Sequence, residues 1–178
     1  MPDVRGFDLV ADLLDDGSRQ KEVFARFGRT VFKTQVFDHA LVNLLTVAGM
    51  IDERMSPDEI DKCFDGLFRK TSGQLVNDVD TQSRLETQIL EICRSAVAER
   101  NRLIHRFFRE HAENFMSCRG QQVMLDDLGE VGDLIEKADS ACQRVMMRIG
   151  APYGFNDEVV QVHVEQMMER LSTSDIDT

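Results

Sequence analysis

The sequence contains little of what folds rich in turns require. Its 178 residues include only 3 prolines, 1 tyrosine, no tryptophan and 11 glycines. A β-sandwich or barrel needs many turns, which are built largely from glycine and proline. The shortage of turn residues therefore favours an all-α fold. We expect residues 1–178 to form a single helical domain, an antiparallel bundle of four to five helices with its core over about residues 19–171.

Paired cysteines and long apolar runs are also lacking. The 4 cysteines are widely spaced and form no C-x-x-C pair, which favours reduced thiols acting as small apolar side chains. The most apolar stretch, residues 40–51, contains Asn43 and Thr46 and is too short to span a bilayer. Residues 1–6 lack the cationic start and apolar run of a signal peptide. We therefore expect a cytoplasmic protein without a membrane segment.

Several enzyme motifs are absent. The sequence has no glycine-rich phosphate loop, no G-x-S-x-G elbow and no H-E-x-x-H. No histidine is preceded by a carboxylate three positions earlier, as di-iron bundles require. The sequence thus predicts neither a metal nor an organic cofactor.

Charge is unevenly distributed along the chain. Asp and Glu number 32 against 21 Lys and Arg, a net charge of −11, which argues against a DNA-coating or membrane-surface role. Residues 94–109, RSAVAERNRLIHRFFR, contain five arginines and one glutamate, a local charge of +4. The rest of the chain therefore carries −15. Such a local positive band can attract an anionic ligand to one place.

Helix starts and breaks divide the chain. Ser56-Pro57-Asp58-Glu59 combines an N-cap serine, a proline in the first turn and a glutamate three residues after the cap. Apolar spacing predicts helices over about 19–51, from 57 to an end or kink at Ser72-Gly73, over about 81–117, over 121–149 and over 157–171. Breaks are expected at Arg119-Gly120 and at 150–154. The acidic tail 172–178 is expected to be disordered.

Helical geometry separates the arginines of the basic segment. At about 100° per residue, Arg100 falls near the middle of the apolar stripe, whereas Arg102 and Arg106 point to the opposite side. Asn101 and His105 are stacked at i, i+4 along the edge of the stripe. Arg100 therefore needs an explanation that the other two do not.

The first long helix offers a partner for Arg100. Asp38 lies within the apolar stripe of that helix, with Gln35 and His39 on one flank. A guanidinium cannot lose its proton to escape burial, so it requires a partner or a wet cleft. We expect Asp38 to face Arg100 across the bundle. These polar residues can alternatively form a satisfied buried network that only sets helix register.

The motif at this position resembles a known family. Arg100-Asn101-Arg102-Leu103-Ile104-His105 matches R-N-x-x-x-H, the signature of the HEPN superfamily of small helical proteins. Residues 98–108, 27–29 and 35–41 are similar to uncharacterised bacterial HEPN-type proteins, so the likeness covers roughly residues 20–145. Many HEPN proteins are metal-independent ribonucleases, including toxins and defence effectors. The resemblance implies a HEPN-like bundle that dimerises and brings two copies of the motif into one cleft.

The resemblance implies roles for the residues of the motif. His105 would be the acid/base group, because histidine titrates near neutral pH. Arg100 would stabilise negative charge on the phosphate, and Asn101 would orient His105 or contact a phosphate. Arg102 and Arg106 would guide the RNA backbone, or else are solvated surface residues.

The remaining expectations concern neighbours of the motif. Asp38, Gln35 and His39 would support the site. His111 also maps to the apolar face, where a packed residue with one hydrogen bond is expected. HEPN toxins paired with a nucleotidyltransferase antitoxin often continue H-x-Y, but Phe107 replaces that tyrosine here. An antitoxin or regulatory protein remains a predicted partner, without that tyrosine switch.

A non-catalytic function competes with the nuclease. The acidic surface, and the lack of aromatic residues between the exposed arginines, are typical of a HEPN-like module used for dimerisation or protein interaction. The sequence leaves both functions open.

Overall fold

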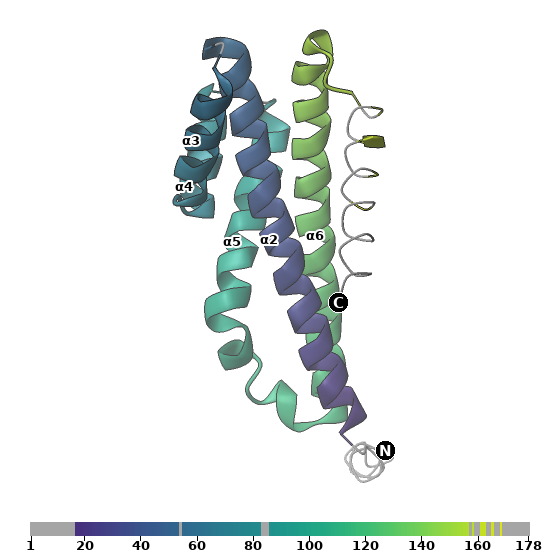
Figure 1. The fold of residues 1–178 in the computed structure, drawn as a ribbon. Helices are drawn as coiled ribbons and strands as arrows, with labels where there is room; N and C mark the ends of the chain where they lie inside the picture. Colours follow the sequence, from purple (N-terminus) through teal and green to yellow (C-terminus); the bar gives the residue numbers. More distant parts are fainter. Residues whose placement is uncertain are drawn as a thin grey trace, which may run out of the picture.

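A computed structural model describes residues 17–53, 55–82 and 86–156, together with a few positions further on (Figure 1). Of the last expected helix, the described positions are Glu158, Gln161, Val162, Glu165 and Met168, all helical. The remainder of that helix, the tail 172–178 and the N-terminal residues 1–16 lie outside the described residues.

The described part of the chain consists of helices joined by short turns and contains no strand, which confirms the all-α prediction. Its five α-helices are α2 (Ser18–Glu53), α3 (Pro57–Phe68), α4 (Ser72–Gln82), α5 (Thr87–Glu110) and α6 (Cys118–Gly150). Two short 3-10 helices, η1 (Asn114–Met116) and η2 (Ala151–Tyr153), flank α6. The expected long first helix and the start at Pro57 are confirmed by α2 and α3.

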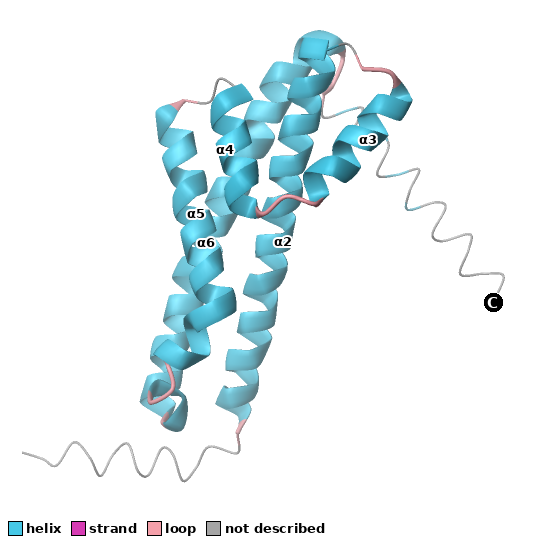
Figure 2. Ribbon diagram, turned by 90° about the vertical axis from the view of Figure 1, so that its left-hand side faces the viewer, coloured by secondary structure: helices cyan, strands magenta, loops and turns pink. Residues whose placement is uncertain are grey.

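Each helix reverses the direction of the one before it, yet the two longest helices run parallel (Figure 1). The Thr30 hydroxyl donates to the carbonyl of Leu128 at 3.4 Å, and Lys33 pairs with Glu136 at 2.8 Å. Both contacts join α2 to α6 in the same order along the chain. Four reversals separate α2 from α6, and an even number of reversals returns the chain to its first direction. The short hairpin of α3 and α4 packs on the C-terminal half of α2, and α4 also contacts α5 (Figure 2).

The helix from Pro57 was expected to end or kink at Ser72-Gly73; it ends at Phe68, and a separate helix starts at Ser72. The backbone N–H of Thr71 donates to Gln74 Oε1 at 2.9 Å, and the backbone N–H of Gln74 donates to Thr71 Oγ1 at 3.3 Å. This reciprocal pair satisfies donors at the start of α4. The helix expected over about 81–117 is α5, Thr87–Glu110, and residues 81 and 82 belong to the end of α4.

The break expected at Arg119-Gly120 is wrong, because both residues lie in the first turn of α6. Ser117 caps this helix, and its hydroxyl accepts the N–H of Gly120 at 3.1 Å. A Cβ on Gly120 would overlap the backbone of Asn114. The glycine thus permits close packing of η1 on α6, and the break lies between Glu110 and Cys118.

Buried apolar side chains from all five helices form one cluster. Its largest members include Phe37 and Leu41 on α2, Leu103 and Phe107 on α5, and Met124 on α6. Burying a side chain of this kind contributes about 1.5–3 kcal/mol to folding. This core fixes the rotation of α2 and α5 about their axes and therefore decides which of their polar residues face each other.

The four cysteines are free thiols; Cys93 and Cys142 are buried, with their sulfur atoms 3.7 Å apart. None of the described helices combines the length and the apolarity that a membrane span needs.

Candidate functional site

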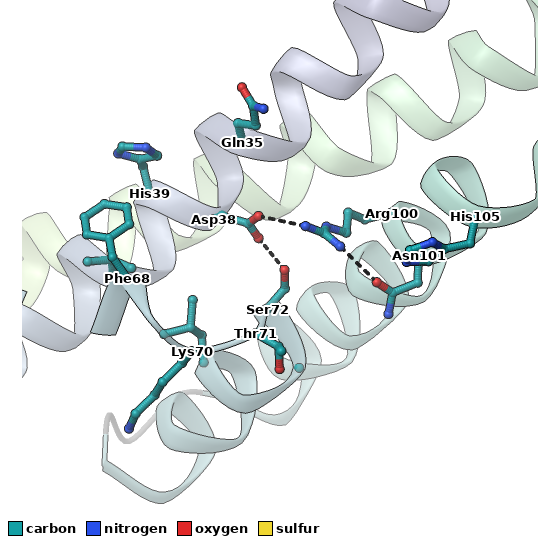
Figure 3. Close-up of a pocket in the computed structure, with 13 residues that line it drawn as sticks. Gln35, Asp38, His39, Phe68, Lys70, Thr71, Ser72, Arg100, Asn101 and His105 are labelled. Carbon is teal, nitrogen blue, oxygen red and sulfur yellow. Dashed lines mark hydrogen bonds and ion pairs between the residues drawn. The ribbon is translucent and has the colours of Figure 1, made fainter. Parts of the chain in front are cut away.

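An open pocket of about 770 Å³ lies between α2 and α5 and is bordered by the turn that joins α3 to α4 (Figure 3). Its walls include six of the eight site residues that the sequence singled out, all but Arg102 and Arg106: Gln35, Asp38, His39, Arg100, Asn101 and His105. The first three come from α2 and the last three from α5. Two segments more than 50 residues apart along the chain therefore form one site.

Asp38 and Arg100 face each other across this pocket, which confirms the pairing that the helical stripes predict. Arg100 Nη2 lies 3.5 Å from Asp38 Oδ2, with side-chain exposures of 29% and 24%. The second carboxylate oxygen of Asp38 accepts a hydrogen bond of 2.6 Å from the buried hydroxyl of Ser72. Asp38 is thus held by both α4 and α5.

The guanidinium of Arg100 is only partly satisfied. Its Nη1 donates to Asn101 Oδ1 at 3.2 Å, and its buried Nε has no hydrogen-bond partner. The 3.5 Å separation from Asp38 exceeds the 2.7–2.9 Å of a strong charge-assisted hydrogen bond. Arg100 therefore retains donor capacity toward the pocket.

Asn101 and His105 present free groups at the same end of the pocket (Figure 3). Because the side-chain oxygen of Asn101 accepts from Arg100, its amide NH₂ remains available as a donor. His105 lies one helical turn further and is exposed. The described residues offer no hydrogen bond or ion pair to its ring.

The opposite wall contains residues that the sequence did not indicate. The end of α3, the turn after it and the start of α4 contribute Phe68, Lys70, Thr71 and Ser72. The ring of His39 lies 4.7 Å from that of Phe68, in a T-shaped contact. No local pattern around residues 68–72 could have revealed this position, since it depends on how the α3–α4 hairpin docks on α2.

Arg102 differs from both sequence expectations, a guide for RNA or a solvated residue. Its guanidinium contacts Glu99 at 2.6 Å, Glu110 at 3.2 Å and Asp127 at 2.6 Å. The hydrogen bonds that Arg102 donates to Asp127 are the main cause of a raised pKa for Arg102. Only 20% of its side chain is exposed. The guanidinium, which is the group that would contact RNA, is already paired with these three carboxylates.

Carboxylates offset other arginines of the basic segment as well. Arg106 lies 3.6 Å from Glu110, and Arg94 lies 2.9 Å from Asp80. Because the acids come from several helices, the +4 charge counted along residues 94–109 is largely compensated in three dimensions. The positive band does not persist as an open basic surface.

His111 is a packed residue, as expected. It is buried, and its Nε2 lies 2.7 Å from Asp127 Oδ2. Its Nδ1 also contacts Asn114 Nδ2 at 3.0 Å. His111 therefore joins α5, η1 and α6, away from the pocket. Among the described residues, no cluster of three His, Cys, Asp or Glu side chains could hold a metal ion.

Comparisons with protein-family models, with curated proteins and with solved structures found no match to this chain. The function must therefore be argued from the pocket itself.

Proposed function

We propose that this protein is a metal-independent endoribonuclease of HEPN type that acts as a homodimer with a shared cleft. One observation carries the proposal: Arg100, Asn101 and His105 of the R-N-x-x-x-H motif line a single open pocket. A buried network that only sets helix register would leave these groups satisfied and closed to solvent. Here the motif reaches solvent.

The proposed reaction needs a group that stabilises charge on a phosphate. The 2′-oxygen of a ribose attacks the adjacent phosphorus, the bond to the 5′-oxygen breaks, and a 2′,3′-cyclic phosphate forms. Arg100 would bind the phosphate oxygens as their negative charge is redistributed, because its guanidinium stays charged and has donors to spare. The amide NH₂ of Asn101 would donate to the same phosphate.

The reaction also needs proton transfers near neutral pH. A base removes the proton of the 2′-hydroxyl, and an acid protonates the leaving 5′-oxygen. The exposed imidazole of His105 suits either role. Two copies of His105, one from each protomer, would divide the roles between them. Asp38, with Gln35 and His39 beside it, would support Arg100 from α2.

Exposed apolar residues beside the pocket support the homodimer. Phe24 and Phe32 on α2 are 54% and 63% exposed. Together with exposed apolar side chains of α5, they form an apolar face. Its five residues are Phe24, Phe32, Val36, Ile104 and Phe108. Val36 and Ile104 stand between pocket residues along their helices, and the Phe24 and Phe108 rings join α2 to α5, with centroids 5.6 Å apart. A second copy that covered this apolar face would bring its own motif beside the first.

The proposed RNA contact is confined to the pocket, because the surrounding chain is acidic and most of the nearby arginines are paired. An antitoxin or regulatory protein would act by covering this pocket. We place the activity in the cytoplasm, where RNA substrates and reduced thiols coexist.

The test is cleavage of structured and unstructured RNAs by the full-length protein in excess chelator. We expect cleavage that leaves 2′,3′-cyclic phosphate ends. Arg100→Ala and His105→Ala should each reduce the rate by about 100-fold or more. Arg109→Ala is the matched control, because Arg109 is an exposed arginine of the same helix outside the pocket, and it should cleave normally.

Circular dichroism and thermal melting must show that the variants are folded. A folded protein that cleaves no RNA of the panel would overturn the nuclease. Cleavage that persists in both Arg100→Ala and His105→Ala would do the same.

A second candidate is a non-catalytic module for dimerisation or protein interaction. The compensation of Arg94, Arg102 and Arg106 by carboxylates favours it, since little open positive charge remains to attract RNA. This function predicts a stable dimer that binds no RNA, with Arg100→Ala and His105→Ala leaving the dimer intact.

A further inference from the structure

We infer that the end of the pocket away from His105 binds a nucleobase, with the ring of Phe68 as its stacking surface. The inference rests on the proposed RNA function and identifies the part of the pocket that would recognise a nucleotide. His39 and Phe68 lie at one end, Asn101 and His105 at the other, and the Asp38–Arg100 pair lies between them (Figure 3).

Phe68 is the last residue of α3, and its ring is held in place while 40% of the side chain stays exposed. The His39 ring lies 4.7 Å away at 65°, and the Phe64 ring lies 4.7 Å away at 70°. These two T-shaped contacts restrict the ring before any ligand arrives. A restricted aromatic ring facing an open pocket is a stacking surface that loses little conformational entropy on binding.

The α3–α4 hairpin, which contains Phe68, is tied to the proposed phosphate site. Ser72, four residues after Phe68, donates its hydroxyl to Asp38 at 2.6 Å, and Asp38 in turn pairs with Arg100 at 3.5 Å. A base and the neighbouring phosphate of RNA are joined by a ribose and so lie at a limited separation. The Ser72–Asp38–Arg100 contacts hold the stacking surface and the guanidinium in a fixed relation to each other.

The size and polarity of the pocket fit a nucleotide. Its volume of about 770 Å³ exceeds what a phosphate alone requires and is typical of small-molecule sites. Stacking on an aromatic side chain is a common way for proteins to bind unpaired bases. Gln35, one turn before His39, adds an amide that can donate to and accept from a base edge. Lys70 also lines this end, with its ammonium paired to Asp78 at 2.7 Å.

The test measures binding of short 2′-O-methyl RNA, in which the attacking hydroxyl is blocked, by fluorescence anisotropy in excess chelator. A second set of probes carries one abasic residue at each position in turn. For the wild type, we expect an affinity loss of about tenfold when the abasic residue falls at the stacked position. Phe68→Leu should bind the intact probe about tenfold more weakly than the wild type does. Its affinity for the abasic probes should be no lower than its affinity for the intact probe.

Two variants serve as controls. Phe68→Tyr keeps an aromatic ring and should keep the affinity and the abasic loss. Tyr153→Leu removes an exposed aromatic ring outside this pocket and should change neither. Thermal melts establish that each variant is folded.

The outcomes separate this inference from the proposed nuclease. An abasic loss that persists in full in Phe68→Leu, or no binding by the folded wild type, overturns the base subsite. RNA cleavage that needs Arg100 and His105 would in that case still support the nuclease. If binding depends on Phe68 but no RNA is cleaved, the base subsite is supported and the proposed nuclease function is overturned.

Discussion

Two arginines of α5 that stand two positions apart have opposite surroundings. Arg100 faces the open pocket with one distant carboxylate, whereas Arg102 is enclosed by Glu99, Glu110 and Asp127. Their separation follows from the helix, since two residues correspond to about 200° of rotation. One guanidinium is placed to meet a ligand, and the other joins α5 to α6.

This contrast predicts unequal stability losses. Arg102→Ala should lower the free energy of unfolding by about 2 kcal/mol, because it leaves three carboxylates without their shared donor. Arg100→Ala should lower it by less than about 1 kcal/mol, since that pair is long and partly exposed. Urea unfolding at neutral pH measures both changes. Equal losses would mean that Arg100 is chiefly structural.

The carboxyl of Asp127 makes stability depend on acid pH. Burial alone would raise the pKa of Asp127, but hydrogen bonds from Arg102 and His111 outweigh burial, so the pKa is lowered. A lowered pKa stabilises the fold above the unfolded value of about 4, and this stability is lost as the pH falls through the folded pKa. Asp127→Asn should therefore be less stable than the wild type at pH 7, with the difference shrinking toward pH 3.

Chemical denaturation at a series of pH values tests this prediction. The matched variant is Asp126→Asn, which changes an exposed neighbour outside the Arg102 contacts and should follow the wild-type pH dependence. A difference between Asp127→Asn and the wild type that stayed constant down to pH 3 would contradict the assignment.

At the scale of helices, the glycines of α6 have different functions. A Cβ at Gly120 would overlap the backbone of Asn114, whereas a Cβ at Gly129 would meet nothing within 4 Å. Both residues lie in the same helix. Glycine costs stability in a helix interior unless close packing requires it.

Substitution by alanine should therefore have opposite effects at the two sites. Gly129→Ala should raise the free energy of unfolding by about 0.5–1 kcal/mol, because alanine favours the helix. Gly120→Ala should lower it by at least about 2 kcal/mol, because η1 must move away from α6. Thermal unfolding of the two variants gives the comparison, and a neutral Gly120→Ala would show that η1 shifts at little cost.

For the whole molecule, the proposed shared cleft requires a dimer. The apolar face beside the pocket should be covered in solution, and analytical ultracentrifugation at micromolar concentration should give twice the mass of one chain. Phe32→Glu should produce a folded monomer, because a charge placed in an apolar interface loses its water without gaining a partner. Val123→Glu, at an exposed apolar position on α6, is the matched control and should remain dimeric. A monomeric wild type would rule out the shared cleft.

Much of the site follows from helical periodicity alone. The apolar stripes of two segments place Asp38 and Arg100 on facing sides, and the structure brings them together. Helix starts with strong local signals, such as Ser56-Pro57, also follow from the sequence. The start of α4 was missed, because Ser72-Gly73 is typical of a helix end and the stabilising Thr71–Gln74 pair is less distinctive.

Composition and periodicity determined by themselves that this chain is helical and that Arg100, Asn101 and His105 share one helix with polar residues near its apolar stripe. Tertiary structure alone decided which charges remain open. Asp127 lies 25 residues beyond Arg102 and closes on it only when α6 packs on α5, and Phe68 and Ser72 reach the pocket only when the α3–α4 hairpin docks on α2. The physical reason is that periodicity sets the direction of a side chain within its own helix, whereas its partners depend on the helices packed against it.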